Sequence, residues 1–176
     1  MIIECIYFMI PAYVANMMPV IMRNKLEYLA KPIDSGLEFC GGPILGAHKT
    51  WRGLIFGIIG SMLAAYIMYL LQSYTYFAQI SVLDYANWEL IGFLMGFGAL
   101  LGDMVKSFFK RRVGIKSGQP WYFVDQIDFP VGSIVLVSLV YFPGWSFAFC
   151  SLLTTVVLTV ATNHVAYFIG IRKVKW

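Results

Sequence analysis

The segment from Leu54 to Leu71 constrains this chain most, because it holds no charged residue over its whole length. As a helix rising about 1.5 Å per residue, it would extend about 27 Å, close to the roughly 30 Å hydrocarbon core of a bilayer. Hydrophobic residues make up 60% of the chain and charged residues only 12%. Soluble domains hold roughly 45–50% apolar residues, so the sequence predicts an all-α integral membrane protein.

Apolar runs long enough to serve as transmembrane helices recur along the chain. We predict five spans, at 2–22, 54–71, 88–109, 126–142 and 147–171. The fourth run is short and bounded by Pro130 and Pro143, so we expect it to be tilted or partly re-entrant. With 176 residues, the chain has the length of one domain, and we predict a single domain over 1–176.

The basic residues predict the orientation of these spans. All thirteen Lys and Arg residues fall in 23–53, in 106–116 and in 172–175. The loop at 72–87 has none. By the positive-inside rule, the amino terminus is outside and the carboxyl terminus is in the cytoplasm, which an odd number of spans allows. This distribution accounts for much of the net charge of +4, so the charge does not indicate a nucleic-acid partner.

Small residues recur at four-residue spacing on the second and third predicted spans. Gly57, Ser61 and Ala65 form one such row, and Gly92 and Gly96 form another. Residues four apart lie on one face of a helix, and small side chains there let helix backbones approach closely. We therefore expect these rows to be packing surfaces.

The second cytoplasmic segment concentrates charge at the end of the third span. If that helix continues through 103–112, then Asp103, Lys106, Ser107 and Lys110 lie on one face. The face carries a carboxylate, a hydroxyl and two ammonium groups. Ionisable groups near membrane segments are costly, which favours a functional reading over a purely structural one.

Two more carboxylates follow. Asp125 and Asp128 share a face if the fourth span begins as a helix. A few carboxylates, completed by substrate phosphates and water, are the usual ligands of Mg²⁺, and nearby cations neutralise the remaining phosphate charge. The open alternative is that each Asp caps a helix or forms a salt bridge with Lys106 or Arg111.

The first cytoplasmic segment, 23–53, is rich in Gly and Pro and is predicted to be a turn-rich loop. Its end, 46–53, reads Gly-Ala-His-Lys-Thr-Trp-Arg-Gly. Backbone amides of a Gly-flanked turn, with Lys49, Thr50 and Arg52 beside them, predict an anion site to which His48 also belongs. The segment is not a Walker A loop, and a basic anchor at the membrane surface is the alternative.

The charged segment reads Gly102-Asp103-x3-Ser107-x2-Lys110-Arg111-x2-Gly114-x-Lys116, followed by Asp125-x2-Asp128. This pattern resembles the carboxyl-terminal signature of membrane CTP:phosphatidate cytidylyltransferases. The short chain and its segment 46–53 are closer to the archaeal branch, the CDP-archaeol synthases. The chain departs from the bacterial pattern at 120–124, Pro-Trp-Tyr-Phe-Val, and at Gln126.

The resemblance implies a membrane nucleotidyltransferase that moves CMP from CTP to an isoprenoid glycerol-phosphate ether lipid and releases pyrophosphate. It implies that the three Asp residues hold Mg²⁺, one ion or two, and that Asp103, Asp128 and Lys110 are catalytic. Phosphate of nucleotide or lipid would be bound by Lys49, Thr50, Arg52, His48, Lys106, Ser107, Arg111 and Lys116. The active site would face the cytoplasm at the plasma membrane, and a homodimer is left open.

Two other classes are compatible with parts of this pattern. A small transporter or cation channel would use carboxylates at the edge of a permeation path. Against it, the charges cluster at one interface and no inverted repeat is evident, although such repeats are common in transporter folds. A non-catalytic lipid-binding scaffold would not need three carboxylates together.

Overall fold

The computed structural model describes residues 1–39, 41–116 and 119–169. The predicted cations at 172–175 lie outside the described residues. The described chain is helical apart from a two-stranded hairpin, which confirms the all-α class. The elements in chain order are α1 (Ile2–Ile21), a 3₁₀ turn (Glu27–Leu29), β1 (Glu38–Phe39), β2 (Gly42–Pro43), α2 (Trp51–Leu71), α3 (Thr75–Ile80), a 3₁₀ turn (Tyr85–Asn87), α4 (Trp88–Arg112), α5 (Val124–Val137) and α6 (Trp145–Phe168).

Four helices in the described part of the chain are long and apolar enough to cross a membrane: α1, α2, α4 and α6. The predicted span at 126–142 corresponds to α5, which has only 14 residues. At about 1.5 Å per residue it extends about 21 Å, less than the bilayer core. The prediction of five spans is therefore not confirmed. Pro130 lies inside α5 instead of bounding it, and its missing N–H leaves the Gln126 carbonyl without that helical partner.

The small residues predicted to pack do so. A Cβ on Gly57 would lie 3.0 Å from the Ala15 carbonyl oxygen of α1, and one on Gly96 would lie 2.5 Å from the Ser61 Cβ. One on Gly92 would lie 2.5 Å from the Cα of Met62. Helix α2 therefore packs closely against α1 on one side and α4 on the other, as expected of small-residue rows in membrane helices.

The closest approach in the bundle is between α4 and α5. A Cβ on Gly132 would lie 2.1 Å from the Gly98 carbonyl oxygen, and one on Gly102 would lie 2.2 Å from the carbonyl oxygen of Asp128. The buried Ser133 hydroxyl adds a hydrogen bond to the Met95 carbonyl at 2.6 Å. Backbone therefore contacts backbone, and this contact sets Asp128 directly beside the α4 residues around Gly102.

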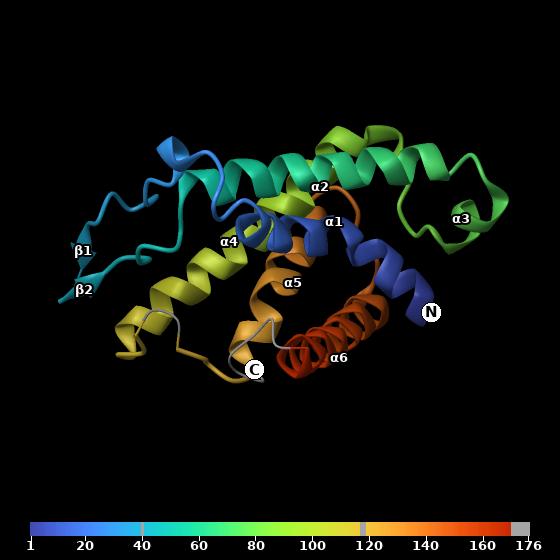
Figure 1. Cartoon of the computed structure of the whole chain (residues 1–176). Helices are drawn as coiled ribbons and strands as arrows, with labels where there is room; N and C mark the ends of the chain where they lie inside the picture. Colours follow the sequence, from blue (N-terminus) through green and yellow to red (C-terminus); the bar gives the residue numbers. More distant parts are fainter. Residues whose placement is uncertain (40, 117–118, 170–176) are drawn as a thin grey trace.

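Helix α6 completes the bundle beside α1 and α5 (Figure 1). The Tyr13 and Thr155 hydroxyls share a hydrogen bond of 2.8 Å between α1 and α6, and Phe8 packs edge-on against Phe147 with ring centroids 5.4 Å apart. The hairpin of β1 and β2 lies at one end of the bundle, where α4 ends, and α3 lies at the opposite end (Figure 1). The turn-rich loop predicted for 23–53 is confirmed up to Trp51, where α2 begins, since its described residues form the 3₁₀ turn, the short hairpin and an isolated bridge between Pro32 and Thr50.

We predict that Gly132→Ala destabilises the protein by about 1–3 kcal/mol, because the new methyl group meets backbone that cannot rotate away. Val131→Ala is the matched control, because Val131 is 39% exposed on the outer side of the same helix. Thermal unfolding in detergent measures both. Equal midpoints for the two variants would contradict the close α4–α5 packing.

Candidate active site

The Lys106 ammonium lies at the centre of the charged cluster. Its Nζ is 3.0 Å from Asp103 Oδ1, 3.1 Å from Asp125 Oδ1 and 2.7 Å from Asp128 Oδ2. Asp103 and Lys106 are one turn apart on α4, whereas the other two carboxylates come from the first turns of α5. The predicted shared faces are confirmed, and the close α4–α5 contact brings all three carboxylates to one cation.

A second ammonium holds Asp125 from the other side. Lys110 Nζ lies 3.0 and 2.9 Å from the two carboxylate oxygens of Asp125, and the Trp121 N–H donates to Oδ2 at 2.7 Å. Burial raises the pKa of Asp125, but the bonds from Trp121, Lys106 and Lys110 outweigh it and hold that pKa below its ordinary value. Asp125 is therefore ionised at neutral pH.

Lys49 completes the cluster from a distant part of the sequence. It lies just before α2, and its ammonium forms an ion pair with Asp103 Oδ2. The cluster thus sets three ammonium groups, from Lys49, Lys106 and Lys110, against three carboxylates. Isolated charges inside the helix bundle would be very costly, and mutual pairing removes most of that cost.

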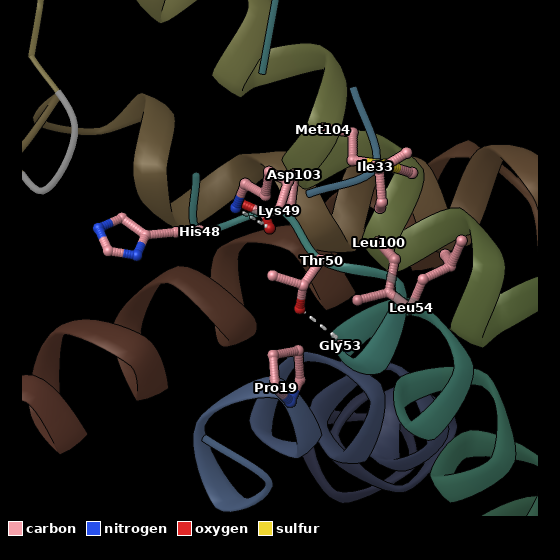
Figure 2. Close-up of a pocket in the computed structure, with 10 residues that line it drawn as sticks. All are labelled: Pro19, Ile33, His48, Lys49, Thr50, Gly53, Leu54, Leu100, Asp103 and Met104. Carbon is pink, nitrogen blue, oxygen red and sulfur yellow. Dashed lines mark hydrogen bonds and ion pairs between the residues drawn. The ribbon is translucent and has the colours of Figure 1, made fainter. Parts of the chain in front are cut away.

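A small cavity adjoins the Lys49–Asp103 pair. It lies between the end of α1, the start of α2, the loop before α2 and the middle of α4 (Figure 2). One part of its wall is polar, with Thr50 beside the ion pair, and the other part is apolar. The apolar wall consists of Pro19, Ile33, Leu54, Leu100 and Met104. A ligand that is part charged and part apolar would suit such a cavity.

Three predicted residues of segment 46–53 have no described ion pair or hydrogen bond with the carboxylates, although His48 and Thr50 line the same cavity as Asp103. Thr50 is the N-cap of α2 and accepts a hydrogen bond from the Gly53 N–H at 3.2 Å. Arg52 is buried and donates to the Lys25 carbonyl at 2.7 Å. His48 is exposed, and its ring points away from the Lys49–Asp103 pair (Figure 2). Of this segment, Lys49 alone among the described residues forms an ion pair with the cluster.

The remaining predicted residues follow α4 toward its end. Ser107 is buried on the helix. Arg111 donates to the Ile115 carbonyl, and the exposed Lys116 lies with it around a second cavity, which Pro43, Gly114 and Ile115 also line. These two cations therefore lie at and just after the end of α4.

Sequence reasoning missed two residues that hold the loop before α2. Asp34 accepts hydrogen bonds from three backbone N–H groups of the loop before α2. Burial raises its pKa, but those bonds outweigh the burial and hold the pKa below its ordinary value. The Asp34-Ser35-Gly36 sequence is a turn signal that identifies such an Asp. Arg112 donates to the carbonyls of Phe39 and Pro43 and lies over the rings of Phe39 and Phe108, contacts that no local pattern predicts.

The carboxylates face ammonium groups, so in the described residues no group of three or more His, Cys, Asp or Glu is arranged to hold a metal ion. Nevertheless, all three carboxylates reach a single cation, the Lys106 ammonium, at 2.7–3.1 Å. A set of hard oxygen donors that converges on one point fits a divalent ion of the Mg²⁺ type.

The bundle and its cluster define a class: a multi-pass membrane enzyme with its charged site inside the helix bundle. A solved structure described as "Structural insight into an intramembrane enzyme for archaeal membrane lipids biosynthesis" has this fold, with a TM-score of 0.75 and 30% identity over 93% of this chain and 94% of that one. The family model for CarS-like CDP-archaeol synthase matches residues 1–176.

Individual relatives agree. CDP-archaeol synthase of Archaeoglobus fulgidus is 32% identical over 100% of this chain and 98% of its own length. That of Methanosarcina mazei is 37% identical over 96% and 100%. The chain belongs to the CDP-archaeol synthase family, and it is a membrane cytidylyltransferase. The transporter alternative and the homodimer find no support in these comparisons.

We predict that Lys106→Met destabilises the fold by about 3–5 kcal/mol, because it leaves three close carboxylates with two ammonium groups. Lys25→Met, at an exposed lysine, is the control for loss of one positive charge. Thermal unfolding without divalent cations measures the difference. If the two variants have the same melting temperature, Lys106 does not hold the carboxylates in place.

Proposed function

We propose that this protein transfers CMP from CTP to the phosphate of 2,3-di-O-geranylgeranylglyceryl phosphate, an unsaturated archaeal ether lipid, giving CDP-archaeol and pyrophosphate. The observation that carries the proposal is the paired cluster of three carboxylates and three ammonium groups inside a membrane helix bundle. Full-length similarity to CDP-archaeol synthases supports the choice of both substrates.

The reaction requires neutralisation of the phosphate charge and correct positioning of the two substrates. An oxygen of the lipid phosphate, already anionic at neutral pH, bonds to the α-phosphorus of CTP. The bond from that phosphorus to the bridging oxygen of the β-phosphate breaks, and pyrophosphate leaves with the electron pair. No strong general base is required. Preorganised positive charge and in-line placement lower the barrier instead.

Asp103, Asp125 and Asp128 are the residues that would hold Mg²⁺. The ion would supply positive charge to phosphate oxygens as charge develops on them. Because the three carboxylates already meet at one cation, binding a divalent ion would release lysine ammonium groups from them. Lys49, Lys106 and Lys110 would then be free to bind phosphate, each as a compact point charge.

The other predicted residues extend this set outward. Arg111 and Lys116, at and just after the end of α4, would bind the outer phosphates of the nucleotide, with Ser107 on the same face of α4 as Lys110. Thr50, Arg52 and His48 would act through the loop before α2, since Thr50 caps that helix and Arg52 secures the loop.

The lipid would reach the cluster from the side. Helices α4 and α5, which carry the carboxylates, also expose apolar side chains on their outer faces: Val105, Phe109, Ile127 and Val131. The isoprenoid tails would remain in the bilayer against these faces. CTP would enter from the cytoplasm at the plasma membrane, because both basic loops lie at that end of the bundle.

We predict that Asp103→Asn and Asp128→Asn each lower turnover by about 10²–10³-fold or more. Each variant would lose a carboxylate that helps to place positive charge at the phosphates. Asp84→Asn, in the loop at the opposite end, is the control. The assay is pyrophosphate release from CTP by purified protein with Mg²⁺ and the geranylgeranyl lipid phosphate.

The same assay discriminates the substrates. Phosphatidic acid as acceptor, and reactions lacking either lipid or Mg²⁺, should give little product. Ordinary activity in purified Asp103→Asn protein would remove the carboxylates from the mechanism. Preference for phosphatidic acid would refute the archaeal lipid as substrate.

We predict that sealed inside-out membrane vesicles convert externally added CTP, whereas right-side-out vesicles do so only after permeabilisation. The reason is that CTP does not cross a bilayer and the site opens at the basic end of the bundle. Product formation in intact right-side-out vesicles would place the site on the outer face.

A further inference from the structure

The loop before α2 brings Lys49 to the cluster, and one buried carboxylate organises that loop. Asp34 is 8% exposed and lies at the base of the hairpin. It accepts hydrogen bonds from the Gly36 N–H at 3.1 Å, the Leu45 N–H at 2.8 Å and the Gly46 N–H at 3.0 Å. One side chain therefore joins the first and last residues of the segment 36–46.

The turn that carries Lys49 is held at both ends. Asp34 binds the Gly46 N–H, and the Lys49 N–H donates to the Gly46 carbonyl at 3.1 Å. The neighbouring Ile33 N–H donates to the Lys49 carbonyl at 2.8 Å, and the Trp51 N–H donates to the Lys31 carbonyl at 3.0 Å. The short segments 31–33 and 49–51 thus run side by side, with Asp34 at the point where they diverge.

From these contacts we propose that Asp34 is a positioning residue, which fixes the turn 46–49 so that the Lys49 ammonium reaches Asp103 and the phosphate that takes its place. Asp34 itself touches neither the carboxylates nor a substrate. The inference deepens the function proposed above and depends on it for its kinetic consequences.

Arg112 separates this role from general support of the loop. Its guanidinium binds the far part of the same hairpin, through the carbonyls of Phe39 and Pro43. Losing Arg112 frees the tip of the hairpin and leaves its base closed by Asp34. Losing Asp34 opens the base, where Lys49 is attached, and leaves the tip held.

The first test is a double-mutant cycle on kcat/KM for CTP. Asp34→Ala should lower kcat/KM by about 10- to 100-fold, the range typical of residues that orient a functional group, and Asp34→Asn, which keeps one acceptor oxygen, should lower it less. Asp34→Ala combined with Lys49→Met should fall within about twofold of Lys49→Met alone, because residues that act through each other are not additive. Arg112→Gln should retain most of the activity.

Multiplicative losses in the double variant, or an equal loss in Arg112→Gln, would overturn the proposal. A wild-type protein that does not use CTP would instead refute the proposed function. These outcomes differ, so a result that refutes the positioning role of Asp34 does not refute the proposed function, and the reverse also holds.

The second test does not depend on enzymatic activity, and it uses the milder variant Asp34→Asn. In Asp34→Asn, hydrogen exchange should speed up at the Ile33 and Trp51 amides, which bond to the Lys49 carbonyl and the Lys31 carbonyl and not to Asp34. Arg112→Gln should speed exchange only near the tip of the hairpin, around Phe39 and Gly42. Unchanged protection of Ile33 and Trp51 in Asp34→Asn would show that Asp34 does not hold the Lys49 turn.

Discussion

The fold depends on the mutual neutralisation of carboxylates and ammonium groups inside an apolar bundle. Three Asp residues and three Lys residues lie within ion-pair distance at the basic end of the helices. Removing one charge leaves an excess of the opposite charge in the cluster, and an uncompensated buried charge costs far more than the pair gains. In the proposed function, a divalent ion and the substrate phosphates would take the place of some of these internal pairs.

Glycine residues determine where this cluster forms. The contacts of Gly98 and Gly102 with Gly132 and Asp128 bring the backbones of α4 and α5 together. Helices separated by ordinary side chains would set Asp128 farther from Lys106. The short α5 fits this role, because a 14-residue helix presents its first turns, with Asp125 and Asp128, against the carboxyl-terminal half of α4.

Much of the site was predictable because its spacing is local. A period of 3.6 residues already places Asp103, Lys106 and Lys110 on one face of α4, and the cluster confirms it. The roles of the residues in segment 46–53 were harder to predict. Its composition suggested anion binding for all its polar residues, but only a folded loop distinguishes Lys49, which reaches Asp103, from Arg52, whose guanidinium faces the Lys25 carbonyl. The length of the fourth span was also misjudged, because hydropathy continues past Val137 where the helix does not.

The sequence by itself determined that the chain is a helical membrane protein and predicted that its basic residues lie at one end, because hydrophobic runs and basic loops respond to the bilayer and need no partner. It also determined which residue types form the site. Only the tertiary structure decided that α5 packs backbone to backbone on α4, that Lys49 crosses from another segment to Asp103, and that Asp34 holds the turn bearing it. These are contacts between residues far apart in the chain, and their geometry depends on packing that no local pattern encodes.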